Sequence, residues 1–160
     1  MGDELPSLCR GADVSLPAPY FQDDAVTIYW GDCREIMPHL PPVDLVLTDP
    51  PYGVGLDYAS HDDGRDGYEQ FIKTTFALMQ AATGLVFVTT GIRNLWLYPP
   101  ADWVMAWSKP NSMRRNDTGG FNMWEPILMW GKRRMWQDFF ELPMVPRNDV
   151  GDHPCPKPPA

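Results

Sequence analysis

The chain has 160 residues, of which 44% are hydrophobic, and a formal net charge of −8, so it is long enough for one domain with a substantial core. It has no run of about eighteen apolar residues, and its acidic N-terminus has no hydrophobic signal region, so we expect a cytoplasmic protein without a membrane span. The cysteines Cys9, Cys33 and Cys155 are far apart in sequence, which argues against a disulfide framework or a zinc site.

The first third of the chain predicts short, irregular elements. Residues 1–22 contain several prolines and glycines without a clear period and predict an irregular arm. The sequence AVTIYWGD, residues 25–32, is β-branched and aromatic and predicts a short strand that ends in a turn. Residues 33–40 predict one or two helical turns, interrupted at a proline. The nearly continuous apolar run VDLVLT, residues 43–48, is typical of a strand buried on both faces.

The remainder alternates between a helix and further strands. Residues 53–67 hold four glycines and four aspartates and predict a long loop, which is usually functional or disordered. Residues 68–82 have apolar side chains at helical spacing. Apolar strands are predicted within residues 84–90, 101–110 and 125–132. Strands interleaved with a helix favour an α/β fold with a mostly parallel sheet.

The sequence TDPPYG directly follows the first of these apolar strands. In an open α/β sheet, ligands bind outside the carboxyl ends of the strands, where Asp49 is expected. A residue before proline is held extended, and Pro50 and Pro51 have no N–H group to donate. Tyr52 then adds a flat ring. The turn therefore predicts a rigid set of oxygen acceptors for a planar ring with an amino group, although a simple strand-ending turn would have the same residues.

This stretch resembles the catalytic loop of the amino-methyltransferases that act on adenine N6 or cytosine N4 of DNA. The resemblance implies a Rossmann-like sheet, S-adenosylmethionine as methyl donor, and a target base flipped out of the duplex. It also implies that Asp49 and the Pro50 carbonyl hold the exocyclic amino group, that Tyr52 stacks on the base, and that Pro51 completes the catalytic motif. Similar loops occur in enzymes that methylate RNA or protein glutamine.

Motif order favours the DNA enzymes whose catalytic half comes first. WSKPN, WEPILMWGK and HPCPKP resemble their motifs W-x-K-P, E-x-I-L-x-x-x-K and H-P-x-x-K-P, and the resemblance extends over about residues 26–158. It implies that residues 23–160 are the catalytic part of one domain whose cofactor-loop half is missing. We therefore expect this polypeptide alone to bind S-adenosylmethionine weakly or not at all, unless a homodimer partner or a C-terminal segment completes the site.

Five residues are expected at the cofactor by the same resemblance. Asp32 matches a position that meets the adenine end of S-adenosylmethionine, and Cys33 follows it. His153 and Lys157 match a segment near the methionine moiety, and Asp49 is also expected at the cofactor. An ordinary turn aspartate and a solvated proline-rich loop remain alternative interpretations of Asp32 and of the His153 segment.

The charge is unevenly distributed. Residues 1–70 have a net charge of −11, and residues 71–160 have a net charge of +3. Because the affinity of a protein for a nucleic acid follows the local electric field more than the total charge, an acidic chain can still have a local face that contacts phosphates. A solvated surface is the alternative. Target recognition is expected within residues 133–152. The basic residues predicted to contact DNA are Arg114, Arg115, Lys132, Arg133 and Arg134.

The sequence thus predicts a DNA methyltransferase of restriction-modification, phage or orphan type. Aspartate rather than serine before P-P-Y favours adenine N6 over cytosine N4. An RNA amino-methyltransferase and a catalytically inactive nucleic-acid-binding remnant are the alternatives.

Overall fold

The computed structural model describes residues 15–53, 57–58, 61–62, 64, 66–112, 115, 118–132 and 137–142. The chain divides into two compact units, residues 1–41 and 42–160. Five of the residues predicted to bind cofactor or DNA lie outside the described residues: Arg114, Arg133, Arg134, His153 and Lys157.

The first unit contains a small hairpin. β1 (Phe21–Gln22) pairs with β2 (Thr27–Ile28) in an antiparallel register. The turn between them is stabilised by Asp23, whose carboxylate accepts hydrogen bonds of 2.8 and 2.7 Å from backbone N–H groups two and three residues further on, which is the usual role of aspartate in such turns. The predicted strand within residues 25–32 is therefore only two residues long, and the predicted irregular arm ends in a strand.

The helical turns predicted after this hairpin are confirmed. α1 (Cys33–Ile36) is followed directly by the 3-10 helix η1 (Met37–His39). Pro38 stands in the first turn of η1, where a proline is tolerated because its missing N–H has no partner within the helix.

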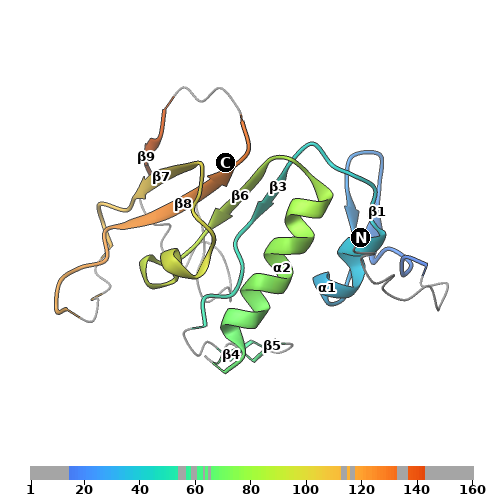
Figure 1. Ribbon diagram of the computed structural model, residues 1–160, viewed down its shortest axis with the longest axis horizontal. Helices are drawn as coiled ribbons and strands as arrows, with labels where there is room; N and C mark the ends of the chain where they lie inside the picture. Colours follow the sequence, from blue (N-terminus) through green and yellow to red (C-terminus); the bar gives the residue numbers. More distant parts are fainter. Residues whose placement is uncertain are drawn as a thin grey trace, which may run out of the picture. The chain divides into compact units, whose positions relative to one another are not determined.

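The second unit is built on a five-stranded sheet (Figure 1). Its strands, in spatial order, are β3 (Val46–Thr48), β6 (Val86–Thr89), β8 (Trp124–Trp130), β7 (Trp103–Ser108) and β9 (Phe139–Glu141). β3 is parallel to β6 and β7 is parallel to β9, but β8 is antiparallel to both of its neighbours.

The sheet is therefore mixed, and the prediction of a mostly parallel sheet was wrong. The reason lies in the connection from β7 to β8, where an Arg115–Phe121 bridge continues the antiparallel pairing beyond the two strands. A hairpin connection of this kind makes its two strands antiparallel, whereas parallel neighbours need a crossover.

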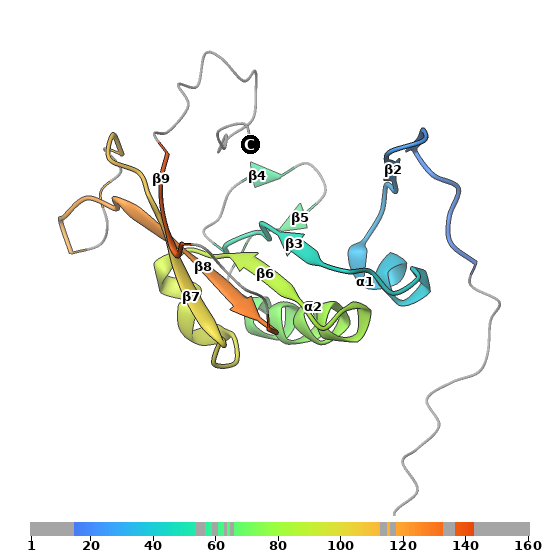
Figure 2. The same ribbon diagram turned by 90° about the horizontal axis from the view of Figure 1, so that it is seen from above.

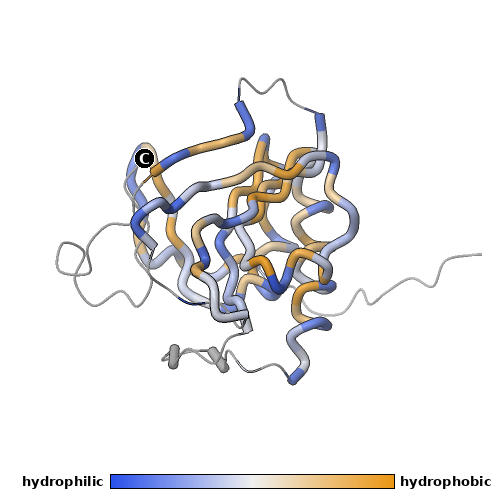
Figure 3. Tube along the Cα trace, turned by 90° about the vertical axis from the view of Figure 1, so that its left-hand side faces the viewer, coloured by the Kyte–Doolittle hydropathy of each residue, from blue (hydrophilic) through white to orange (hydrophobic). Residues whose placement is uncertain are grey.

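One helix covers one face of the sheet. α2 (Tyr68–Ala82) connects β3 to β6 and lies along the sheet (Figure 2), as its apolar spacing predicted. Its side chains Ile72, Phe76 and Met79 are buried, and burial of each such side chain contributes about 1.5–3 kcal/mol. The Phe76 ring lies 4.5 Å from the Trp130 ring of β8. Figure 3 shows hydrophobic residues along the central strands and polar and apolar residues alternating along the helix.

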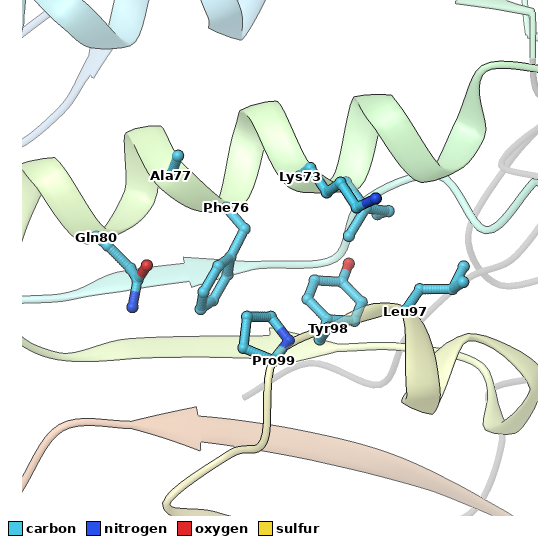
Figure 4. Close-up of a pocket in the computed structure, with 8 residues that line it drawn as sticks. Lys73, Phe76, Ala77, Gln80, Leu97, Tyr98 and Pro99 are labelled. Carbon is cyan, nitrogen blue, oxygen red and sulfur yellow. The ribbon is translucent and has the colours of Figure 1, made fainter.

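Between α2 and the chain after β6 is a groove (Figure 4). The chain there forms the 3-10 helix η2 (Ile92–Leu97), which was not predicted. The buried Tyr98 meets Phe76 edge-on, with 6.0 Å between ring centroids. The groove has a volume of about 360 Å³ and is lined by Ile72, Lys73, Phe76, Ala77, Gln80, Leu97, Tyr98 and Pro99. None of these residues belongs to the D-P-P-Y turn.

Two predictions about the segment from 43 to 67 need correction. Among the described strands, β3 has a neighbour on one side only. Its Leu47 is 69% exposed, so the strand is not buried on both faces. The predicted loop contains a short antiparallel pair, β4 (Asp57–Tyr58) and β5 (His61–Asp62).

Candidate active site

Several polar residues meet at one edge of the sheet. β3, β6 and β7 run in the same direction because β8 is antiparallel to β6 and β7 and β3 is parallel to β6. Their carboxyl ends therefore lie at the same edge, which is where open α/β sheets bind ligands. Asp49 follows β3, Thr89 ends β6, Lys109 follows β7, and Glu125 lies in the first residues of the antiparallel β8.

The strand alternation also places these four residues on the same face. Trp130 packs against α2 and pairs with Val86, so both belong to the helix-covered face. Because side chains alternate along a strand, Thr89 and Glu125 belong to the opposite face. Hydrogen bonds then join Asp49 to Thr89, and Lys109 to Glu125.

A proline opens this edge of the sheet. Pro126 stands in the central strand β8, where proline is rare because it cannot donate to the ladder. Thr90 donates to the Pro126 carbonyl at 3.2 Å, but Pro126 has no N–H with which to return a bond. The ladder between β6 and β8 therefore stops here, and the chain leaves the sheet at Gly91.

Two buried side chains, Tyr68 and Asn94, donate hydrogen bonds to backbone carbonyls of the D-P-P-Y turn. The Tyr68 hydroxyl donates to the Pro51 carbonyl at 2.7 Å. Asn94, which is 1% exposed, donates its side-chain amide to the Tyr52 carbonyl at 2.8 Å and to the Tyr68 hydroxyl at 3.1 Å. No described residue donates to the Pro50 carbonyl. Within the described structure, the Pro51 and Tyr52 carbonyls therefore each accept a hydrogen bond, whereas the Pro50 carbonyl accepts none.

Gly53 completes the turn in a left-handed conformation, with φ of 63°. A Cβ atom at this position would lie 2.9 Å from Cγ of Tyr68. Both the backbone angle and the close ring favour glycine here, so the turn and the start of α2 are held close together.

The Tyr52 side chain connects the turn to the sheet. Its hydroxyl lies 2.8 Å from Oδ1 of Asp49 and also contacts Oε1 of Glu125. Burial, and then the negative charges of Glu125 and Asp49, raise the pKa of Tyr52 far above its usual range, so the hydroxyl keeps its proton. The ring is half-buried, and Gly91 lies against it.

A buried ion pair between Lys109 and Glu125 contacts Tyr52 through Glu125. Lys109 Nζ is 2.6 Å from Oε2 of Glu125, and the two side chains are only 11% and 7% exposed. The ammonium group also lies 5.0 Å from the ring centroid of Trp107, within the range of a cation–π interaction. Asp49 is exposed, in contrast, and accepts a hydrogen bond from Thr89 through Oδ1.

The four residues Asp49, Pro50, Pro51 and Tyr52 are thus brought together at an open strand end. The other predicted cofactor residues in the described structure belong to the first unit. Asp32 caps α1 by accepting from the backbone N–H of Arg34, and it forms an ion pair with the Arg34 side chain. Partial burial raises the pKa of the Cys33 thiol.

The predicted DNA contacts are described for two residues only. Arg115 is exposed in the connection between β7 and β8, and Lys132 is exposed just beyond the far end of β8. The seven residues of β8 separate them, at about 3.4 Å per residue, so these two cations do not form a single patch.

Sequence reasoning missed Tyr68, Thr89, Asn94, Lys109 and Glu125 as site residues. For two of them a signal was present: Lys109 is the lysine of WSKPN, and Glu125 is the glutamate of WEPILMWGK. The described residues contain no cluster of acidic, histidine and cysteine side chains suited to a metal ion. Among them there is also no helix long and apolar enough to cross a membrane.

Comparisons with known proteins give limited guidance. No family model matches the chain, and no curated protein matches it. Among solved structures, the crystal structure of the M1.HpyAVI–SAM complex is similar in part, with a TM-score of 0.46 and 18% sequence identity. The match covers 73% of this chain and 64% of that chain, so this chain spans less than two thirds of its neighbour's length.

Proposed function

We propose that this chain forms the base-binding side of a DNA amino-methyltransferase, which transfers a methyl group from S-adenosylmethionine to the exocyclic amino group of an extruded base, with adenine N6 preferred over cytosine N4. The observation that carries this proposal is the distribution of acceptors in the D-P-P-Y turn. Tyr68 and Asn94 occupy the carbonyls of Pro51 and Tyr52, and the Pro50 carbonyl and the exposed Asp49 carboxylate lie at the open strand end.

Two such acceptors match the two hydrogens of an amino group. An amine attached to an aromatic ring is a poor nucleophile because its lone pair is delocalised into the ring. Hydrogen bonds from both N–H groups to fixed oxygens favour a more tetrahedral nitrogen, whose lone pair can then attack. The turn can hold this geometry because its backbone is restricted by the prolines and supported from below, so much of the catalytic effect comes from positioning.

S-adenosylmethionine would supply a methyl group already activated on a positively charged sulfur. The exposed carboxylate of Asp49 at the strand end suits a nearby positive charge. The amino nitrogen that accepts this methyl group would have one proton to lose, and Asp49 and Pro50 are the residues that would hold that amino group. Asp49 is exposed, so a proton that it accepts has a route to water.

The test measures methylated bases in cells that express the gene for this protein. DNA and RNA are digested separately, and N6-methyladenine and N4-methylcytosine are quantified by mass spectrometry. Asp49→Ala should abolish the signal in DNA, because it removes one of the two acceptors. Asp44→Ala, which removes the same charge at an exposed position just before β3, should retain it.

The other outcomes decide between the alternatives. Methylation confined to RNA would replace the DNA enzyme by an RNA amino-methyltransferase. Absence of any methylated base, together with retained nucleic-acid binding, would support an inactive remnant.

A further inference from the structure

The connection between β7 and β8 starts and ends at the edge of the sheet that holds the D-P-P-Y turn. It leaves β7 after Ser108 and enters β8 at Trp124. Because β7 is parallel to β3 and β8 is antiparallel to both, both of its ends lie where β3 also ends. In the sheet, β8 is two strands away from β3. At about 4.8 Å per strand, the start of β8 is therefore about 10 Å from the start of the turn.

A cation and an aromatic ring stand opposite each other in this connection. Arg115 pairs with Phe121 in an antiparallel bridge, and residues paired in this way have their side chains on the same side, with Cβ atoms about 5 Å apart. Both residues are exposed, and 46% of the Phe121 side chain surface faces solvent. Arg115 and Phe121 therefore project together from one face of the hairpin.

The exposed apolar surface continues from Phe121 to the sheet. Met123 and Trp124 are 46% and 38% exposed, whereas the next residue, Glu125, is buried. Large apolar side chains in water lack the free energy that burial would provide. Single exposed ones are common on protein surfaces, but three within four residues are typical of an interaction site.

The local charge favours a polyanion as the partner. Residues 109–123 include three basic residues and one acidic residue, a net charge of +2, whereas residues 1–70 have a net charge of −11. Nucleic acids present phosphates beside flat bases, so they suit a surface that pairs a cation with an aromatic ring. An acidic or purely apolar protein partner would use only half of this surface.

The extruded base gives such a surface a specific role. When a base leaves the duplex, its neighbours lose a stacking partner, which costs free energy. DNA-binding proteins that separate base steps often insert apolar side chains such as phenylalanine or methionine between them. Phe121 lies on the same edge of the sheet as the proposed base site, on a segment that starts about two strand spacings away.

We propose that the connection between β7 and β8 is a DNA-binding hairpin, in which Phe121 stacks on a base that flanks the extruded nucleotide and Arg115 contacts an adjacent phosphate. This inference rests on the proposed function. Phe121 stabilises the duplex with its target base extruded, and it takes no part in the chemistry at the amino group. Arg115 adds affinity that does not depend on the sequence of the DNA.

Duplex and single-stranded forms of the same DNA test the role of Phe121. PCR products, which have no methylated bases, are used native and heat-denatured, and methyl incorporation from radiolabelled S-adenosylmethionine is measured. Phe121→Ala should lower kcat/KM on native DNA by about 5- to 100-fold, the range for loss of one stacked base. On denatured DNA, which has no duplex stack to open, the change should be less than about threefold. Equal losses on both forms, or no loss on native DNA, would overturn the proposal.

Matched controls separate these effects from a general loss of structure. Phe139→Ala removes a phenylalanine that is 56% exposed in β9 and should match wild type on both forms of DNA. Arg115→Gln should reduce the slope of log K against log salt concentration by about 1. Lys73→Gln makes the same change of charge at an exposed position in α2 and should leave the slope unchanged. An unchanged slope for Arg115→Gln would contradict the phosphate contact. Circular dichroism checks that each variant folds.

A duplex that already contains a gap tests the hairpin without methyl transfer. Fluorescence anisotropy compares a labelled duplex that has one abasic site with the intact duplex. The wild-type protein should bind the abasic duplex about fivefold more tightly or better, and Phe121→Ala should remove most of this preference. No preference in the wild type, a preference that Phe121→Ala retains, or binding to RNA alone would overturn the proposal. A preference that depends on Phe121, in a protein that transfers no methyl group, would refute the proposed function and leave the hairpin as a DNA-binding element.

Discussion

The support beneath the D-P-P-Y turn gives the most direct test of the structure. Asn94→Ala removes the donor to the Tyr52 carbonyl and to the Tyr68 hydroxyl. A buried carbonyl left without its donor costs about 1–3 kcal/mol, and loss of the second hydrogen bond costs about 0.5–1.5 kcal/mol. We therefore expect the free energy of unfolding to fall by roughly 2–4 kcal/mol.

Urea unfolding measures this loss. With a slope of about 2 kcal/mol/M, the midpoint should fall by about 1–2 M. Tyr68→Phe, which removes the bond to the Pro51 carbonyl and the acceptor of one Asn94 amide bond, should cost about 1–3 kcal/mol. Trp96→Ala is the control on the same 3-10 helix, because its side chain is 84% exposed and exposed substitutions usually stay within about 0.5 kcal/mol.

The same substitution should also reduce methyl transfer. A turn that loses one support can shift by a fraction of an ångström, and misplacement on this scale costs about 10- to 100-fold in rate. The midpoint and the kcat of Asn94→Ala are therefore expected to fall together. If both equal those of Trp96→Ala, Asn94 does not support the turn and the geometry argued above is incorrect.

Three further predictions concern other parts of the molecule. Lys109→Met leaves Glu125 buried without its lysine and should lower the free energy of unfolding by about 3–5 kcal/mol, whereas the double variant with Glu125→Met should recover most of this loss in urea titrations. Gly131→Ala should lower the free energy of unfolding by about 3 kcal/mol or more, measured by thermal unfolding. Gly131 has φ of 104°, and a Cβ atom there would clash with the Gly84 carbonyl oxygen. Gly84→Ala is the control, because its Cβ would meet nothing within 4 Å. Because burial raises the pKa of Cys33, less thiolate is present at pH 8 than in an unstructured peptide, and peptide mapping should show slower alkylation by iodoacetamide; an equal rate would contradict this environment.

Local patterns predicted the local elements well. The apolar run before Asp49 and the helical spacing of residues 68–82 each describe one segment, and each was confirmed as a strand or a helix. The direction of β8 was not predicted, because it depends on the pairing of residues far apart in sequence. The exposure of Leu47 was not predicted for a similar reason: hydrophobicity alone does not show which neighbours a strand acquires.

The site shows the same division between local and distant information. The rigid turn at residues 49–52 follows from its prolines, and the sequence predicted it. The inward direction of the Tyr52 hydroxyl depends on Glu125, and the position of its carbonyl depends on Asn94, which is 42 residues away in the chain. Neither contact leaves a periodic pattern, so the sequence predicted an open stacking ring where the structure has a half-buried ring tied by its hydroxyl.

The position of β3 has a practical consequence for measurements on this protein. Among the described strands, β3 pairs only with β6, so its other edge has no strand partner there, and its Leu47 side chain is exposed. A strand of this kind is a template for pairing with another molecule, and here it leads directly into Asp49. Self-association through this edge would increase with protein concentration, so turnover per molecule should be compared across a dilution series before rates of different variants are interpreted.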